Sequence, residues 1–247
     1  MDAVETFIYD SDIRIKAVRL SESLEALFEA QNISEKDRLL FSKAALLSAA
    51  FASEEKDDDG SVFVSVKDPE TRTAFTALCE TDGRLRGTPD EYKENGFDET
   101  VLTVGRRLVS RGDYQSAVMG RNFEDAAREY FSSSRQTKAE TAFPDGKAFV
   151  FAEYFPGHDV NYLAGAKKAT PEYIESKLSD GMTAILSYLE DGTPSEKLKK
   201  VSETEIVFGC TCAKRKIKKA LEATENLTLP IEVRCRFCGK TYTIEEM

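Results

Sequence analysis

The sequence predicts an α+β protein made of a mixed helix and sheet core, a helical linker and a small metal-binding module. Helical patterns come first and strand patterns follow, as is typical of a domain with segregated helices and sheets. A long amphipathic pattern comes after the strands, and four of the five cysteines fall in the last 38 residues. We therefore expect a core domain over 1–165, an amphipathic helical linker over 166–205 and a four-cysteine metal-binding module over 206–247.

The expected core begins with a helical region and continues with strands. Residues 21–52 have a helical pattern, and Ser34 with Asp37 resembles a capping box ahead of a long apolar run. After Gly60, the run SVFVSV alternates in the manner of a strand. Further strands are expected at 72–79, 100–105, 114–119, 138–143 and 147–155, with a tight turn at Asp82-Gly83.

An acidic run precedes Gly60 and consists of Glu54, Glu55, Asp57, Asp58 and Asp59. The run lacks the spacing and the terminal glutamate of an EF-hand calcium loop. We therefore expect a solvated turn rather than a calcium site.

One more helix interrupts the expected strands. Asn122 is a good N-cap residue, and an apolar stripe with helical spacing follows it. The stripe consists of Phe123, Ala126, Ala127, Tyr130 and Phe131.

The linker helix is expected to begin at Thr170-Pro171, a cap followed by proline at the first helical position. Its apolar stripe consists of Ile174, Leu178, Met182, Ile185, Leu186 and Leu189. Gly181 inside it costs about 1 kcal/mol relative to alanine, and a polar stretch, 193–205, leads on to the cysteines. Two interpretations stay open: a connecting helix packed on the core, or a linker whose apolar face can be uncovered.

The net charge and the absence of export or membrane signals in this sequence argue against several classes of function. The net charge is −10, while residues 201–247 carry eight basic against seven acidic residues, so the body is acidic. An acidic body argues against a general nucleic-acid binder. No apolar run approaches the roughly 20 residues of a membrane span, and the first 16 residues have neither the basic nor the apolar region of a leader peptide, so we expect a cytoplasmic protein with reduced cysteines. His158 is expected to be an exposed loop residue.

The cysteines provide the strongest functional signal. Cys210 and Cys212 form a CxC pair, and Cys235 and Cys238 form a CxxC pair after 22 intervening residues. Two short-spaced pairs supply the four tetrahedral ligands that zinc prefers, so these four thiolates are expected to bind one zinc ion per chain. The remaining Cys79 is expected to pack as a small apolar residue.

The charge of the flanking residues and the small size of the module indicate how the four thiols could behave. Basic residues flank the pairs and would favour thiolates, or would form a nucleic-acid patch in the manner of zinc ribbons. They are Lys214, Arg215, Lys216, Lys218, Lys219, Arg234, Arg236 and Lys240. A module of about 40 residues rarely folds without a metal or a covalent staple. Loss of the metal should therefore unfold it, which makes thiol chemistry a folding switch.

The sequence resembles the 33 kDa chaperonin family of redox-regulated heat-shock proteins. The tail carries the resemblance most strongly, with FGCTCAKRKIKKAL followed by IEVRCRFCGKTYTIEEM. TALCETDGRLRGT and YQSAVMGRNFEDAAREYFSSSRQTKAETAF are also similar to family segments and stand in the same order.

The resemblance implies a holdase chaperone of the stress response. The family binds zinc on its reduced cysteines and is then inactive. By resemblance, oxidation forms the disulfides Cys210–Cys212 and Cys235–Cys238, releases zinc, and unfolds the module and linker. Unfolding client proteins then bind, commonly to a dimer.

Two alternatives remain at this stage. The first is a zinc ribbon that binds RNA or a protein partner constitutively. The second is a thiol oxidoreductase that uses the CxxC pair, although this pair lies outside a βαβ context. We expect no enzyme activity, because the P-loop, GxGxxG, GxSxG and HExxH motifs are absent from the sequence.

Overall fold

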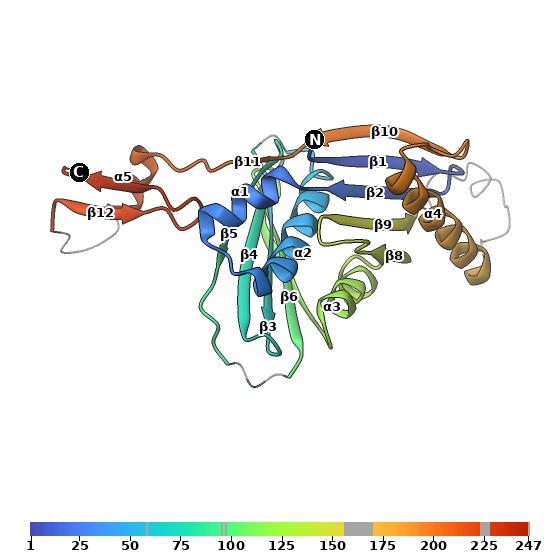
Figure 1. Ribbon diagram of the computed structural model, residues 1–247, viewed down its shortest axis with the longest axis horizontal. Helices are drawn as coiled ribbons and strands as arrows, with labels where there is room; N and C mark the ends of the chain where they lie inside the picture. Colours follow the sequence, from blue (N-terminus) through green and yellow to red (C-terminus); the bar gives the residue numbers. More distant parts are fainter. Residues whose placement is uncertain (58, 95, 97, 156–169, 223–227, 247) are drawn as a thin grey trace.

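A helix between two β-sheets forms the body of the protein, and a small cysteine-bearing module projects from one end (Figure 1). The computed structural model describes residues 1–57, 59–94, 96, 98–155, 170–222 and 228–246. His158 lies outside the described residues. The mixed helices and sheets, with the cysteines near the C-terminus, confirm the α+β fold class.

The first sheet contains five antiparallel strands in the order β10-β1-β2-β9-β8. Their bounds are β1 Ala3–Tyr9, β2 Ile13–Arg19, β8 Ala139–Ala142, β9 Ala148–Tyr154 and β10 Leu198–Glu205. β10 ends at Glu205, and the chain joins the second sheet two residues later, at Val207.

The second sheet contains six strands in the order β11-β5-β4-β3-β6-β7. Their bounds are β3 Ser61–Asp68, β4 Thr73–Glu80, β5 Arg84–Pro89, β6 Thr100–Leu108, β7 Gly112–Gly120 and β11 Val207–Phe208. Only β11 pairs in parallel, with β5, and the other neighbours are antiparallel.

The helical region predicted at 21–52 is two helices. α1 (Glu22–Gln31) ends at Asn32, which adopts the left-handed conformation with φ 53°, and α2 (Glu35–Ala52) begins after Ser34. The Ser34 hydroxyl donates to the Asp37 carboxylate at 2.5 Å, and no side-chain cap bond to the helix backbone forms. α2 lies between the sheets (Figure 1), which explains why its second half, from 44 to 52, is entirely buried.

The predicted helix after Asn122 is present as α3 (Phe123–Glu129), and the Asn122 side chain accepts a bond from the Asp125 amide at 2.9 Å. It continues into a π-helix, η1 (Tyr130–Ser134). The predicted apolar stripe is buried over its whole length.

The linker helix is α4 (Pro171–Asp191), and Thr170 caps it by accepting the Tyr173 amide at 3.3 Å. It packs on the face of the first sheet opposite α2. Its buried residues join an apolar cluster with Phe7, Ile13, Ile15 and Val150. The polar stretch that follows differs from expectation, because residues 198–205 form the edge strand β10, paired with β1.

The first two residues of the acidic run before Gly60 do not lie in the solvated turn that the sequence predicted, whereas Asp59 is exposed as expected. The side chains of Glu54 and Glu55 are about nine-tenths buried and bind arginines of the core. The physical reason is tertiary: α2 ends where three arginines from other elements converge, so the carboxylates compensate buried positive charge.

Candidate metal centre

Two separate turns place the cysteine pairs in the module. Cys210 and Cys212 lie between β11 and α5 (Lys214–Leu221), whereas Cys235 and Cys238 lie between β12 (Ile231–Arg234) and β13 (Thr241–Ile244). In the second turn the Cys235 amide donates to Lys240 O at 2.8 Å and the Gly239 amide donates to Cys235 O at 2.9 Å. Gly239 has φ +70°, a conformation that suits glycine and tightens the turn.

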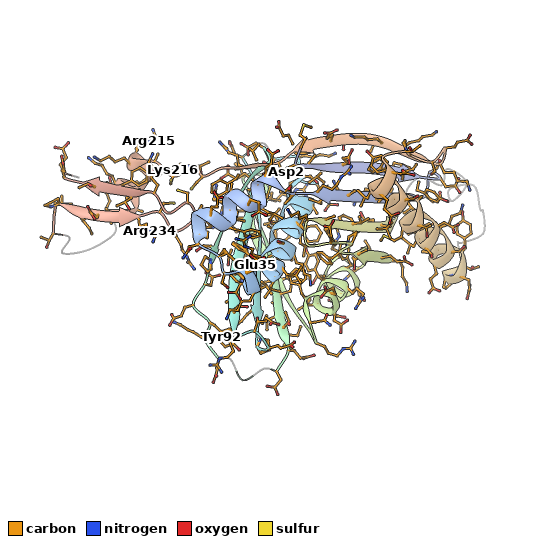
Figure 2. The ribbon with its side chains drawn as sticks, in the orientation of Figure 1. Asp2, Glu35, Tyr92, Arg215, Lys216 and Arg234 are labelled. Atoms are coloured by element: carbon orange, nitrogen blue, oxygen red, sulfur yellow. The ribbon has the colours of Figure 1, made fainter. Side chains whose placement is uncertain are left out.

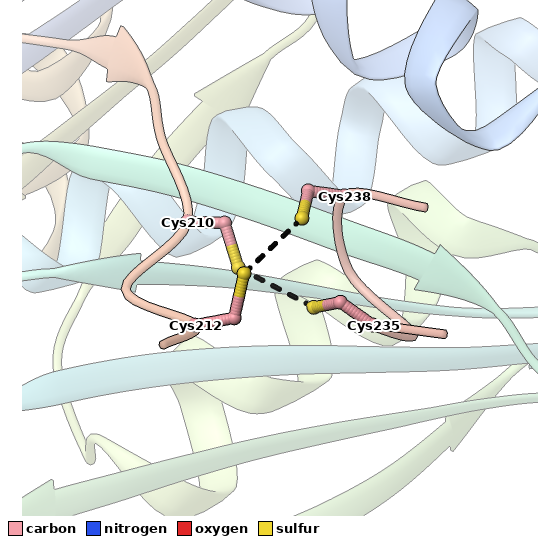
Figure 3. A group of neighbouring side chains, drawn as sticks. All are labelled: Cys210, Cys212, Cys235 and Cys238. Carbon is pink, nitrogen blue, oxygen red and sulfur yellow. Dashed lines mark hydrogen bonds between the residues drawn. The ribbon is translucent and has the colours of Figure 1, made fainter. Parts of the chain in front are cut away.

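The four sulfur atoms converge on one point (Figure 3). All of them lie within 4.8 Å of one another. Contacts join the two pairs, with Cys210 Sγ 3.6 Å from Cys235 Sγ and Cys212 Sγ 3.4 Å from Cys238 Sγ. A tetrahedral zinc site with Zn–S bonds of about 2.3 Å has sulfur separations of about 3.8 Å. The donor set and its spacing therefore fit a metal ion of the zinc type.

Tyr242, on β13, contacts the centre and was not among the residues predicted from the sequence. Its hydroxyl lies 3.1 Å from Cys212 Sγ and donates to Cys212 O at 3.2 Å. An outer-shell donor of this kind orients a thiolate ligand. The only sequence signal for it is its place in the aromatic strand that follows the CxxC pair.

The environment separates the acidities of the thiols. Burial opposes ionisation of Cys212, but hydrogen bonds with Tyr242 and with neighbouring thiols lower the pKa of Cys212 to about 7. Burial raises the pKa of Cys210 and of Cys238. The hydrogen bond to Cys212 raises the pKa of the Tyr242 hydroxyl to about 12. Cys212 is thus the thiol most readily ionised among those shifted, and ionised thiols are the form that binds metal and reacts with oxidants.

One arginine of the core contacts the intervening residues of both cysteine pairs. Arg86, on β5, donates to the Thr211 hydroxyl at 3.3 Å, and its guanidinium lies 5.3 Å from the centre of the Phe237 ring. Glu80 forms an ion pair with Arg86 and accepts from Thr211 at 3.3 Å. We call Arg86, Glu80, Thr211 and Phe237 the docking cluster.

Two further contacts hold the CxxC turn against the core. The Gln31 side-chain amide, at the end of α1, donates to the backbone oxygens of Arg236 and Phe237, at 3.1 Å for Arg236. The Arg236 guanidinium forms an ion pair with Asp90. These contacts could not be predicted from local sequence patterns, because they join residues more than 140 positions apart.

The flanking basic residues divide into two groups. Lys214, Arg215, Lys216 and Lys219 are exposed on α5, and Figure 2 shows Arg215 and Lys216 on the projecting module together with Arg234. Arg234 is exposed as well, but its side chain donates to Gly239 O at 3.2 Å and so supports the CxxC turn.

Cys79 lies apart from the centre, on β4, and is completely buried. Burial raises the pKa of its thiol well above the ordinary value. Its placement agrees with the packing role expected from the sequence.

The described helices include none that is long and apolar enough to cross a membrane.

Comparisons with known proteins match nearly the whole chain. A family model described as Hsp33 protein matches residues 2–245. A 33 kDa chaperonin of Streptococcus pneumoniae is 23% identical over 99% of this chain and 92% of its own length. A 33 kDa chaperonin of Bacillus cereus is 25% identical, over 60% of this chain and 56% of its own length. The crystal structure of a heat shock protein 33 homologue from Thermotoga maritima superposes with a TM-score of 0.69 at 15% identity, covering 99% of this chain and 94% of the other.

Proposed function

The chain belongs to the Hsp33 family, a family of chaperones, and we propose that it is a redox-regulated holdase. In this proposal Cys210, Cys212, Cys235 and Cys238 bind one structural zinc ion in the reduced state. Oxidation of these thiols releases zinc, unfolds the module and loosens the linker. The protein then binds unfolding client proteins in the cytoplasm, as a dimer, without enzyme turnover.

The convergence of four sulfurs from two separate turns is the observation that carries the proposal. The module has little apolar core of its own, since Ile244 is the only residue fully buried among its described residues after β11. Such a module needs another source of folding energy. When bound, zinc on four thiolates supplies it, with an apparent binding energy of roughly 10–16 kcal/mol in small zinc domains.

Oxidation would remove the ligands in a balanced step. Two thiolates of one pair lose two electrons and form a disulfide, while one hydrogen peroxide takes up two electrons and two protons to give two waters. Two peroxide molecules therefore convert all four ligands. A disulfide sulfur no longer has the charge of a thiolate, so the module loses its metal ligands.

The location of the disulfides matters for the switch. The sulfur contacts described here run between the pairs, so distance alone does not select Cys210–Cys212 and Cys235–Cys238. A bond between the pairs would close a loop of about 25 residues and restrict the unfolded module, which stabilises the folded one. Bonds within each pair leave the two turns free to separate. We therefore propose the pairing that allows unfolding.

Loss of the module's fold would also remove its support for the core. The docking cluster and the Gln31 bonds depend on the shape of both cysteine turns. α4 covers an apolar face of the first sheet, so its release would expose a surface able to hold apolar segments of client proteins.

The direct test combines zinc content with protection from aggregation. Reduced protein should contain one zinc per chain and give little suppression of light scattering by a heat-unfolded test enzyme. Peroxide with mild heat should release the zinc, measured with a chromogenic chelator, and induce suppression. Zinc release without suppression would contradict the holdase proposal.

The same samples discriminate the alternatives. A constitutive zinc ribbon would bind RNA in a salt-dependent way while reduced, and an oxidoreductase would turn over a disulfide substrate. Peptide mass spectrometry of the oxidised protein tests the pairing, because a dominant Cys212–Cys235 bond is incompatible with two local disulfides.

A further inference from the structure

Tyr242 connects the second cysteine turn to one sulfur of the first. It lies on β13, after the CxxC pair, and its hydroxyl is 3.1 Å from Cys212 Sγ and 3.2 Å from Cys212 O. Among the described residues, no other side-chain hydroxyl hydrogen-bonds to one of the four sulfurs. This contact therefore distinguishes Cys212 from the other three candidate ligands.

Contacts along β12 and β13 hold the Tyr242 side chain in this position. β13 pairs with β12, and Val233 lies opposite Tyr242. Ile244, two residues further along β13 and therefore on the same face, is fully buried and anchors the strand. The Lys240 ammonium group lies 5.3 Å from the centre of the tyrosine ring. The hydroxyl is thus placed beside the sulfur by the fold, which lowers the entropy that the hydrogen bond costs.

The Tyr242 hydroxyl has one proton and two acceptors within reach. A thiolate only accepts hydrogen bonds, and a bond to an ionised group is roughly twice as strong as one to a neutral carbonyl oxygen. The proposed zinc site requires Cys212 to be ionised, because thiolates are the form that binds metal. In that state the proton is directed at Cys212 Sγ in preference to Cys212 O.

A hydrogen bond to a thiolate changes how the sulfur reacts. Electron density drawn toward the proton is less available for attack on an oxidant, and the nucleophilicity of a thiolate falls as the thiolate is stabilised. A metal-bound thiolate is already ionised, so the hydrogen bond cannot speed oxidation by producing more thiolate. Its net effect on Cys212 is therefore a slower attack.

We propose that Tyr242 protects the Cys212 thiolate from oxidants while the four cysteines hold their metal. The protected step is attack of Cys212 Sγ on hydrogen peroxide, which breaks the O–O bond, forms a sulfenic acid and releases hydroxide. Cys210 Sγ then displaces a second hydroxide and forms the disulfide, so two thiolates lose two electrons to one peroxide. This inference rests on the redox-regulated function proposed above and names the residue that determines how fast one of its thiols reacts.

Initial rates of alkylation measure the reactivity of each thiol in the reduced, zinc-loaded full chain. Low doses of N-ethylmaleimide, followed by peptide mass spectrometry of singly modified chains, give one rate per cysteine. Tyr242→Phe keeps the ring and removes the hydroxyl. We expect this variant to be modified about fivefold faster at Cys212, with less than about twofold change at Cys235 and Cys238.

The matched control is Thr243→Val, which removes an exposed hydroxyl from the same strand. It should leave the rate at each cysteine within about twofold of the wild type. With peroxide in place of the alkylating reagent, the Cys210–Cys212 disulfide should form several-fold faster in Tyr242→Phe than in the control. Faster reaction of Cys212 in a protein that never suppresses aggregation would support this inference and contradict the holdase proposal alone.

Three results would overturn the role of Tyr242. An unchanged rate at Cys212 in Tyr242→Phe, with one zinc per chain, would show that the hydroxyl does not affect the sulfur. An equal rise at all four sulfurs would mean that the module had loosened as a whole. Should the variant not bind zinc, the wild type decides: Cys212 must be modified more slowly than Cys235, whose sulfur contacts no hydroxyl of the described side chains, or the proposal fails.

Discussion

In the proposed zinc site each of the four thiols supplies one of four tetrahedral ligands, so the loss of a single sulfur should have a large effect on metal affinity. Cys235→Ser leaves three thiolates and one weakly binding hydroxyl. We expect the purified reduced variant to lose tightly bound zinc, measured by atomic absorption after dialysis. Full zinc occupancy in this variant would refute the four-thiolate assignment. Cys79→Ser is the control and should keep one zinc per chain, because Cys79 lies buried on β4.

Lys16, on β2, is a buried basic residue. Its side chain is 3% exposed overall and donates to the hydroxyls of Thr6, at 3.1 Å, and Ser53, at 2.8 Å. Burial, only partly offset by Glu54 and Glu153, lowers the pKa of Lys16 from 10.5 to about 8. The folded chain therefore loses this proton about two and a half pH units before the unfolded chain does.

The stability of the protein should respond to this shift. Between pH 8 and 10.5 the unfolded state binds more protons at Lys16 than the folded state, so the free energy of unfolding gains a rising contribution from this residue. The contribution is roughly 3 kcal/mol over the window, at 1.36 kcal/mol per pH unit. Urea unfolding of the wild type and of Lys16→Met at several pH values measures it as a difference. Equal slopes in the two proteins would contradict the buried, shifted lysine.

Among the elements, α4 has a low intrinsic helix propensity at Gly181 but packs closely against the first sheet. Gly181 lowers its helix propensity, yet a β-carbon at this position would lie 3.3 Å from the Ile15 side chain, so glycine allows the helix to approach the sheet. Leu178 and Ile185 are buried against that sheet. Full burial of each contributes about 1.5–3 kcal/mol. Packing rather than propensity therefore holds α4 in place.

Leu178→Glu with Ile185→Glu should release α4 without oxidation. A charged carboxylate cannot remain at these positions without a partner, so the helix should detach and uncover the apolar face beneath it. We expect partial suppression of aggregation by the reduced variant, and faster amide hydrogen exchange over 171–191. The exposed pair Glu175→Gln and Ser179→Ala is the control.

Hydrogen exchange of the wild type tests the linker directly. If residues 171–191 stay equally protected after zinc release, the linker does not take part in the switch, even if the protein is a chaperone.

The elements show what local pattern can and cannot predict. The alternation of β3, the caps of α3 and α4 and the turn at Asp82-Gly83 are encoded locally and were predicted. β1 was missed because α2 and α4 cover opposite faces of the first sheet, so this strand has apolar residues on both faces and does not alternate. β2 does alternate, with Arg14 and Lys16 between apolar residues, so its strand signal was present in the sequence and was overlooked. β10 was missed because its exposed residues read as a polar connection, and its pairing with β1 joins distant positions.

In the candidate metal centre, the cysteines could be predicted from the sequence, whereas the residues that contact them could not. Metal-ligand spacing is a property of the sequence, so the four cysteines are recognisable as a ligand set from the sequence alone. Tyr242, Arg86 and Gln31 were not, because their contacts with the cysteine turns depend on how the module sits on the core. The domain boundaries at 165 and 205 remain predictions.

At the scale of the whole molecule, Arg86 connects the core to both cysteine pairs. Arg86→Met keeps an apolar stem beside Phe237 but removes the guanidinium and its bonds to Thr211 and Glu80. Loss of one cation–π contact and one hydrogen bond should weaken docking by about 1–2 kcal/mol. We expect peroxide to release zinc several-fold faster, measured with a chromogenic chelator. Lys219→Met, exposed on α5, is the control, and equal rates in all three proteins would exclude a docking role for Arg86.

The chain from β10 to β11 also determines how the molecule responds to mechanical force. Once the contacts of Gln31, Arg86 and Asp90 with the module are broken, a pull on the cysteine module acts through residues 198–208, which pass from one sheet to the other. β11 resists with two parallel register pairs on β5, whereas β10 is held by seven antiparallel pairs on β1. β11 should therefore separate from β5 first, and the separation should stop at Glu205, where the pairing of β10 with β1 begins. The second sheet would lose an edge strand under load while the first kept its own.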